Sequence, residues 1–374
     1  MSQEVSVKPM EFLGFAGLGL SVLLHMIFVA ITLGAGLVTA IYRYLAYRRS
    51  DPSLEVFARR GFRVMIVTEL FSGVWGTIIT VFLAGFFPGL VALATNVLFT
   101  PIAVAIASIM IRIPSIAIFW YTWGRISPKI HSLVGWVMAL SGFGIPLGFR
   151  TLFSEITYPY AVATYLSEGF VNPWSAYGSS LFWSLYLHTV FATISAGAFF
   201  LASVESLVKD IRGVSIALRY GFIFLILQLF AGPLYWYTLH RDSPYVFNAV
   251  TFGNFSPFLV LKMILVVVLI ILGLYSLATI TLRNEIYRYT KYVGLIALVV
   301  VFLGELLNDG SRYPYIVTLG ERGLALSAFF NLYMDIPASV VFVILGFLFL
   351  AIAVFIISFY YAIVKRFLPE IPER

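Results

Sequence analysis

Two histidines lie inside long apolar segments, where an ionisable side chain is costly. His25 stands in the stretch HMIFVAITLG, and His188 stands in SLYLHTVFATISAGAFF. A neutral imidazole is a common ligand of metal ions and of haem iron, and an ionisable group at membrane depth points to function by default. The alternative is that each histidine hydrogen-bonds a neighbouring helix, because buried polar groups need partners.

Two carboxylates and an arginine follow one another at the end of a later apolar segment. Glu305 and Asp309 are four residues apart, which places both on one face of a helix, and Arg312 comes three residues later. Together with the histidines this set would suit haem, with imidazole or carboxylate for the iron and cations for the propionates. The carboxylates could instead be solvated or capping groups in the interfacial layer, and Arg312 could be an ordinary loop charge. We expect His131 and His240, at the ends of apolar segments, to be solvated.

The composition is that of a polytopic membrane protein. Of the 374 residues, 61% are hydrophobic and 11% are charged, and the mean hydropathy is +0.98. A soluble globular domain carries about 25% charged residues. The chain has no cysteine, which excludes disulfides, zinc–thiolate sites, iron–sulfur clusters and covalent c-type haem attachment. The net charge of +7 comes from connections between apolar segments, so we expect lipid and no nucleic acid as a partner.

Runs of about 20 or more predominantly apolar residues predict an all-α bundle of nine membrane-spanning helices, forming one domain over residues 1–374. The predicted spans are 11–47, 60–86, 96–124, 130–152, 178–208, 215–239, 256–283, 289–309 and 335–365. Most lysines and arginines lie in alternate connections, which by the positive-inside rule places the N-terminus outside and the C-terminus in the cytoplasm.

This topology assigns Arg150 and Arg312 to the outer side and leaves Arg112 and Lys262 within the membrane. The large connections 153–177 and 310–334 also fall on the outer side, where they could cover a site. His25 and His188 should lie at similar depth in the outer halves of their helices. The two histidines, the two carboxylates and Arg312 are therefore expected to converge near the outer face.

Three short motifs, in this order along the chain, resemble subunit I of the cytochrome bd-type oxidases. Residues 25–34 are similar to the first-helix signature of that family, in which a histidine is followed by F-V-x-x-T-L-G. Residues 188–197, H-T-V with a glycine nine residues after the histidine, resemble the fifth-helix haem segment. Residues 312–315, RYPY, resemble the G-R-Q-P-W motif at the end of helix eight, and Gly73-Val74 matches part of G-V-x-T-G on helix two.

The resemblance implies a role for each site residue. His188 matches the ligand of a low-spin haem b, and His25 matches the histidine of the high-spin haem pair, where oxygen is reduced. Asp309 lies near the position of a glutamate that ligates the second high-spin haem. Glu305 is an alternative ligand or a proton-handling group, and Arg312 would bind haem propionates.

The second ligand of the low-spin haem is expected to be a methionine on the seventh helix. If Lys262 takes the position of the family's arginine, Met263 is one residue early, about 100° around a helix, and would need a local bulge to act as the ligand. The resemblance further implies two haems b, with a haem d or a third haem b in addition. It also implies a subunit II-like or second subunit I-like partner, a quinol as electron donor, and the plasma membrane as location.

Two departures from the family's pattern bear on whether this chain reduces oxygen. Residues 101–114, which match the helix that carries two glutamates of the family's proton path, contain Arg112 and no carboxylate. A proton would then need another route, to which Glu69 or Glu305 could contribute. Residues 232–257 lack the family's quinol-binding pattern. Either the donor differs, the quinone binds differently, or a paired subunit provides that site.

Three hypotheses follow. The chain is an oxygen-reducing subunit that passes electrons through haem b to high-spin haems, or a degenerate subunit I paralogue that serves a catalytic partner in structure and electron transfer. The third is a proton-coupled transporter with His25, Glu69, Arg112 and Glu305 as its relay. The transporter hypothesis does not account for the three ordered motifs.

Overall fold

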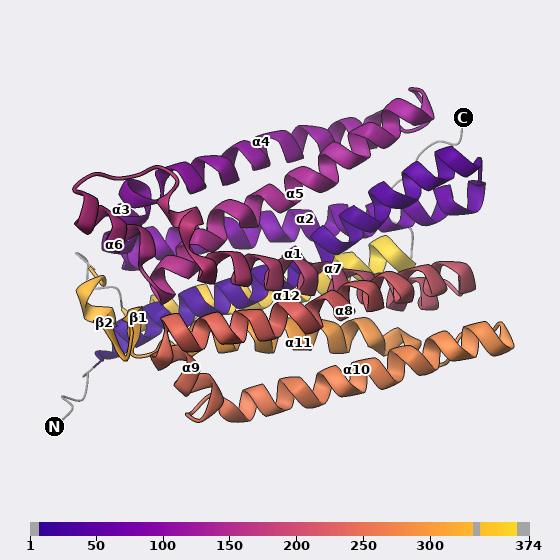
Figure 1. The fold of residues 1–374 in the computed structure, drawn as a ribbon. Coiled ribbons are helices and arrows are strands. Elements are labelled where there is room, and N and C mark those ends of the chain that lie inside the picture. Colours follow the sequence, from indigo (N-terminus) through magenta and orange to yellow (C-terminus); the bar gives the residue numbers. More distant parts are fainter. Residues whose placement is uncertain (1–6, 332–336, 365–374) are drawn as a thin grey trace.

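Long helices run side by side along the length of the molecule (Figure 1). The computed structural model describes residues 7–331 and 337–364. The long helices in these ranges are α1 (Pro9–Arg49), α2 (Pro52–Phe86), α4 (Phe99–Tyr121), α5 (Pro128–Thr157), α7 (Ser180–Leu207), α8 (Ile211–Asp242), α10 (Ser256–Arg283), α11 (Val293–Gly310) and α12 (Ala338–Val364). Within the described residues, 8 helices, α1 to α11 in this series, are long and apolar enough to cross a membrane. The predicted all-α membrane bundle is thus confirmed, with α12 in the range predicted for the ninth span.

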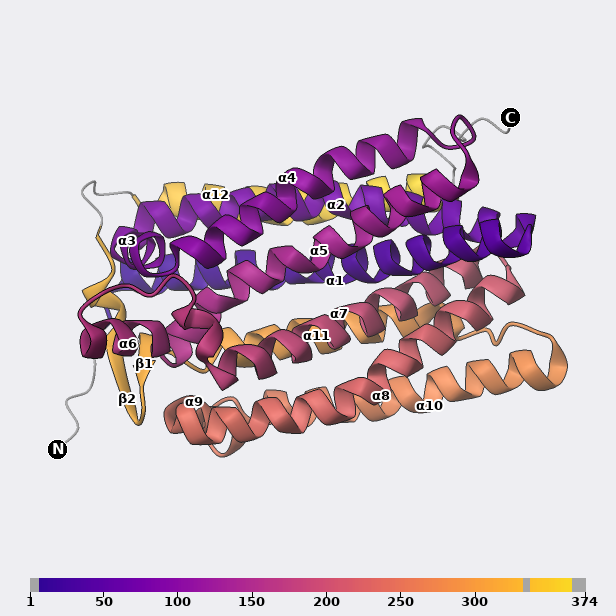
Figure 2. The same ribbon diagram turned by 45° about the horizontal axis from the view of Figure 1, so that its top comes forward.

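Short elements occupy the connections at the end of the bundle where α1 begins (Figures 1 and 2). They are α3 (Pro88–Val97), α6 (Tyr160–Glu168), the 3-10 turns η1 (Ser175–Gly178) and η3 (Leu326–Ala328), α9 (Pro244–Thr251), and strands β1 (Tyr315–Leu319) and β2 (Arg322–Ala325). One further 3-10 turn, η2 (Thr290–Tyr292), precedes α11. The strands pair antiparallel around Gly320, whose φ of +63° is a conformation that glycine adopts without a Cβ clash.

Polar caps start several helices. A side-chain oxygen accepts a backbone N–H of the first turn at Asp51 for α2, Ser127 for α5, Ser179 for α7 and Asp210 for α8. Helix α2 therefore begins well before the predicted start at residue 60, although its first turns are charged. Arg59 pairs with Glu55 at 3.3 Å, and Arg60 pairs with Glu205 of α7 at 2.6 Å. Hydropathy alone does not detect helical turns that are held by caps and ion pairs.

The four connections that carry most of the basic residues lie together at one end of the bundle, on the right in Figure 1. They join α1 to α2, α4 to α5, α7 to α8, and α10 to α11. At this end Arg212 of α8 donates a hydrogen bond of 2.7 Å to Asp51, which lowers the pKa of that carboxyl to about 2. The alternation of basic connections agrees with the positive-inside pattern, and the assignment of this end to the cytoplasm stays a prediction.

Helices α1 and α7 form the centre of the bundle. In the most apolar 18-residue stretch of each helix, 83% of the residues are buried in α1 and 67% in α7, against 11% in α10. The two central helices touch at glycines: a Cβ added to Gly34 of α1 would lie 2.6 Å from the Cα of Gly197 of α7. Small residues at such a contact let two helices in a membrane approach closely.

This glycine contact sets the depth of both histidines. His25 precedes Gly34 by nine residues, and His188 precedes Gly197 by nine residues. Both helices run in the same direction (Figures 1 and 2). With a rise of 1.5 Å per residue, each histidine lies about 14 Å along its helix from the contact. The predicted similar depth of the two histidines therefore follows from the packing of α1 on α7.

Candidate functional site

A cavity of about 480 Å³ lies beside His188. Residues of α7, α8, α10 and α11 form most of its wall, and the lining is largely apolar. The polar groups that face it include Arg150, His188, Gln228, Tyr235, Lys262, Glu305 and Asn308. A mostly apolar cavity between facing helices, with a few polar groups, is the usual form of a cofactor site in a helix bundle.

Helix α8 supplies the wall beside the imidazole of His188. The Gln228 Nε2 atom lies 2.5 Å from Nδ1 of His188 and 3.1 Å from its Nε2. The ring of Tyr235 is tilted against the imidazole, with the centroids 5.4 Å apart. A Cβ added to Gly232 would lie 3.9 Å from Nδ1, an ordinary van der Waals contact, so α8 passes beside the ring at this residue.

Met263 lines the same cavity as His188. Helix α10 runs without interruption from Ser256 to Arg283, so the bulge that seemed necessary to bring Met263 to the site is absent and is not needed for this contact. Lys262, the preceding residue, also faces the cavity, and its Nζ lies 3.1 Å from the point where Gly304 of α11 would carry a Cβ. The two neighbouring residues therefore both border this space, and Met263 is also 54% exposed at the surface of the bundle.

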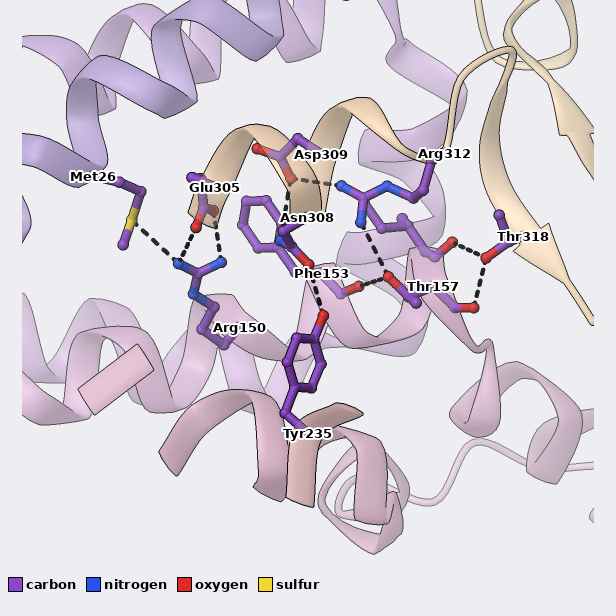
Figure 3. A network of polar contacts seen from close by, with 11 residues as sticks. Met26, Arg150, Phe153, Thr157, Tyr235, Glu305, Asn308, Asp309, Arg312 and Thr318 are labelled. Atoms are coloured by element: carbon purple, nitrogen blue, oxygen red, sulfur yellow. Dashed lines mark hydrogen bonds and ion pairs between the residues drawn. The ribbon is translucent and has the colours of Figure 1, made fainter. Parts of the chain in front are cut away.

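Glu305 forms a buried ion pair with Arg150 (Figure 3). Arg150 donates to both carboxylate oxygens, at 2.8 and 2.9 Å, and to the sulfur of Met26 at 3.4 Å. Arg150 is 3% exposed and lies on α5, within the span predicted for residues 130–152. The sequence placed it on the outer side of the membrane and did not indicate that it is buried in an ion pair.

Asp309 and Arg312 form a second pair one turn further along (Figure 3). Arg312 donates to Oδ1 of Asp309 at 2.7 Å and to Thr157 Oγ1 at 3.1 Å. The hairpin is fixed to the same place, because Thr318 Oγ1 donates to the Thr157 carbonyl at 2.6 Å. The Oδ2 atom of Asp309 is buried and has no hydrogen-bond partner in the described part of the chain. Arg312 is therefore a buried group of the site and no loop charge.

His25 bridges α1 and α2. Its Nδ1 lies 2.9 Å from the Ser72 carbonyl oxygen. Because a carbonyl can only accept, Nδ1 carries the proton and Nε2 keeps its lone pair, which is the tautomer of a metal-ligating histidine. Gly76 passes beside the ring, with its Cβ position 3.4 Å from Cε1. The interhelical hydrogen bond and a ligand role are thus compatible, since they use different nitrogens.

The other predicted groups lie apart from this site. His131 is fully buried, which corrects the expectation that it is solvated: α5 starts at Pro128, so His131 packs in its first turn between Arg43, at 2.8 Å, and the Phe119 carbonyl, at 2.9 Å. His240 is exposed, as predicted.

The transporter relay is divided between separate ion pairs. Glu69 is held by Arg112, which donates to it at 2.9 and 2.7 Å and to the Met138 carbonyl at 2.7 Å. Glu305 is held by Arg150. Each carboxylate has its own arginine from another helix, so the proposed relay residues form two units.

Several site residues were missed by the sequence reasoning, namely Arg150, Gln228, Tyr235 and Asn308. Tyr235 donates to Asn308 at 2.9 Å, which links α8 to α11 beside the cavity (Figure 3). Gln228 had a detectable signal, because it is one of only two glutamines in the chain and interrupts the apolar run FLILQLF. A tyrosine or asparagine near the end of a span carries no such signal.

The donor set fits haem better than a metal ion bound by protein alone. In residues 7–331 and 337–364, no three His, Asp or Glu side chains come together as a metal site. His188 with Met263, His25 and Asp309 instead offer donor atoms singly or in a pair, which suffices for haem because the porphyrin supplies the remaining ligands of iron. The residues that are present therefore fit this prosthetic group.

Comparisons with known proteins support the resemblance to subunit I of the cytochrome bd-type oxidases. A family model described as cytochrome bd terminal oxidase subunit I matches residues 16–252. A protein of Bacillus subtilis (strain 168), described as a candidate cytochrome bd menaquinol oxidase subunit I, is 23% identical over 195 residues. That alignment covers 49% of this chain and 41% of the relative, so it spans less than half of the relative's length. The bd oxidase structure from Geobacillus thermodenitrificans superposes with a TM-score of 0.79 at 17% identity, covering 96% of this chain and 99% of that chain, which shows a shared fold.

Proposed function

This chain belongs to the cytochrome bd terminal oxidase subunit I family, and we propose that it is the subunit of a terminal oxidase that passes electrons through a haem b at His188 to high-spin haems that reduce oxygen to water. The observation that carries this proposal is the cavity at His188. It combines an imidazole, a thioether and the cations of Arg150 and Lys262 in a largely apolar space between the central helix α7 and its neighbours.

At the low-spin position, His188 and Met263 would hold the haem iron, and Lys262 would hold a propionate. Both ligands and the lysine face one cavity, which supports this assignment. When bound, haem supplies the electron transfer and the oxygen chemistry, while the protein sets ligation, orientation and dryness.

At the high-spin position, His25 would offer Nε2 and Asp309 would offer Oδ2. The Ser72 carbonyl holds the first group in the ligating tautomer, and the free buried oxygen of the second is available. Arg312 would bind propionates as a charge-assisted donor. Glu305 would handle protons. Because Arg150 binds both of its carboxylate oxygens, Arg150 would first have to move away.

The proposal includes a plasma-membrane location, a quinol donor and a subunit II-like or second subunit I-like partner. The family supports these features in general. In this chain the connection from α8 to α10 contains only the short helix α9, Pro244–Thr251, so the donor would bind over a smaller outer surface than a long loop provides.

The test is haem extraction from the purified complex, combined with oxygen uptake driven by a reduced quinol. We expect two haems b with a haem d or a third haem b, and oxygen uptake that depends on the quinol. A purified complex with no extractable haem would contradict the proposal.

A second candidate function is favoured by α4. This helix carries Arg112, paired with Glu69, where the family has two glutamates of its proton path. A degenerate subunit I paralogue would keep one or two haems and serve a catalytic partner. Oxygen uptake by this chain together with only a small subunit II would exclude that alternative.

A further inference from the structure

A chain of hydrogen bonds runs from the wall of the His188 cavity to Asp309, and the roles proposed above do not use it (Figure 3). The Tyr235 ring lies against the imidazole of His188, with the centroids 5.4 Å apart, while its hydroxyl donates to Oδ1 of Asn308 at 2.9 Å. The amide Nδ2 of Asn308 in turn donates to Oδ1 of Asp309 at 3.3 Å. The chain therefore ends on the same carboxylate oxygen that Arg312 binds at 2.7 Å.

The orientation of the Asn308 amide follows from its two neighbours. Asp309 is paired with Arg312 as a carboxylate, which only accepts hydrogen bonds, so the amide must turn its NH₂ group toward it. The amide oxygen then faces α8, where the Tyr235 hydroxyl is its donor. Asn308 is buried, so without this hydroxyl its oxygen would be an acceptor without a partner, and the amide would lose the contact that orients it.

Two donors on Oδ1 decide which oxygen of Asp309 is left over. The terminal torsion of an aspartate side chain is broad and roughly two-fold, so its rotation can exchange the two carboxylate oxygens. One arginine could follow either oxygen, whereas Arg312 and Asn308 together hold Oδ1 in one place. Oδ2 then stays buried and without a partner among the described residues, and it is the atom that the proposed function offers to iron.

We propose that Tyr235 and Asn308 are positioning residues for Asp309. The Tyr235 hydroxyl orients the Asn308 amide, and the amide holds Oδ1 of Asp309, so that Oδ2 is presented as the ligand of haem iron. The inference rests on the proposed function, since it requires a haem at Asp309. A hydrogen bond that only tied α8 to α11 would contribute to stability and leave the properties of the iron unchanged.

The proposal predicts a shift of reduction potential with a definite sign. A hydrogen bond to a ligating carboxylate draws electron density from it, so loss of one donor makes Asp309 a stronger ligand, favours the ferric state and lowers the potential. Asn308→Leu removes the donor at similar size and should lower the midpoint potential. Tyr235→Phe frees the amide and should lower it by a smaller amount. Because Tyr235 acts through Asn308, the double variant should match Asn308→Leu.

The experiment is a redox titration of the purified complex, followed at the high-spin haem signal that Asp309→Ala removes. Tyr186→Phe is the matched control, because the Tyr186 hydroxyl also bridges two helices, donating from α7 to the Phe143 carbonyl of α5 at 3.1 Å, and is no part of the chain to Asp309. We expect lowered midpoint potentials in Tyr235→Phe, in Asn308→Leu and in their double variant, and the wild-type value in the control.

Each outcome decides the matter. A potential that is not lowered in Tyr235→Phe or in Asn308→Leu, an equal shift in Tyr186→Phe, or shifts that add in the double variant would overturn the inference and leave the proposed function in place. So would a high-spin signal that does not depend on Asp309. If Asn308→Leu loses the signal, a potential lowered in Tyr235→Phe but not in Tyr186→Phe supports the inference, and any other result overturns it. A wild-type complex without high-spin haem removes the proposed function and the inference together.

Discussion

At the scale of single residues, one oxygen atom distinguishes the two carboxylates of α11. Both oxygens of Glu305 are bound by Arg150, whereas Asp309 uses Oδ1 for Arg312 and leaves Oδ2 free. The spacing in the sequence placed the two carboxylates on one helical face correctly. It could not separate their roles, because their arginine partners come from different elements.

This difference predicts unequal effects on haem content. Asp309→Ala should reduce the high-spin haem signal, because it removes the free oxygen donor, while Glu305→Gln should retain it, because the glutamate oxygens are engaged by Arg150. Reduced-minus-oxidised spectra of both variants measure this. Loss of the signal in Glu305→Gln, with full signal in Asp309→Ala, would assign the ligand to Glu305 instead.

The buried ion pair itself predicts non-additive stability changes. Arg150→Met leaves the Glu305 carboxylate buried without its partner and should lower the free energy of unfolding by about 3–5 kcal/mol. The double variant Arg150→Met/Glu305→Met removes both charges and should be distinctly more stable than the single one. Thermal unfolding of the detergent-solubilised protein compares them. Equal stability of the single variant and the wild type would show that the pair is not desolvated as described.

At the scale of elements, helix identity was predictable from hydropathy, and helix ends were not. The first eight predicted spans correspond to long apolar helices, but α2 and α5 extend beyond their predicted bounds through capped or charged turns. The earlier start of α5 matters, because it puts His131 in the first turn of the helix, where the side chain is buried. The hairpin β1–β2 was not predicted, since two short strands of mixed polarity have no clear periodic signal.

The contact of α1 with α7 is the element-scale feature that a mutation tests best. Gly34→Val would place a branched side chain against Gly197 and push the two central helices apart. Overpacking of this kind costs about 1–3 kcal/mol, so we expect a lower unfolding temperature and weaker haem retention at both histidines. Gly19→Val is the control on the same helix, because nothing lies within 4 Å of its Cβ position. A Gly34 variant as stable as the control would refute the close contact.

At the scale of the whole molecule, the connections rich in lysine and arginine lie at one end of the bundle, as the alternation of charge along the sequence predicts. The side of the membrane that this end faces can be tested with introduced cysteines. The chain has no cysteine, so single introduced cysteines report their side without background. Lys129→Cys lies in the first turn of α5, next to the α4–α5 connection, and Glu321→Cys lies at the turn of the hairpin. These two places are at opposite ends of the bundle (Figure 1). A membrane-impermeant maleimide added to intact cells should label Glu321→Cys and spare Lys129→Cys. The reverse labelling would invert the predicted topology.

The central claim is that His188 ligates a low-spin haem b, and the reduced-minus-oxidised spectrum of the His188→Ala variant tests it most directly. His240→Ala is the matched control, because it removes a histidine that is exposed at the end of α8. The claim predicts that the low-spin band disappears in His188→Ala and persists in the control, with the protein present in equal amount. A low-spin band of wild-type size in His188→Ala would contradict it.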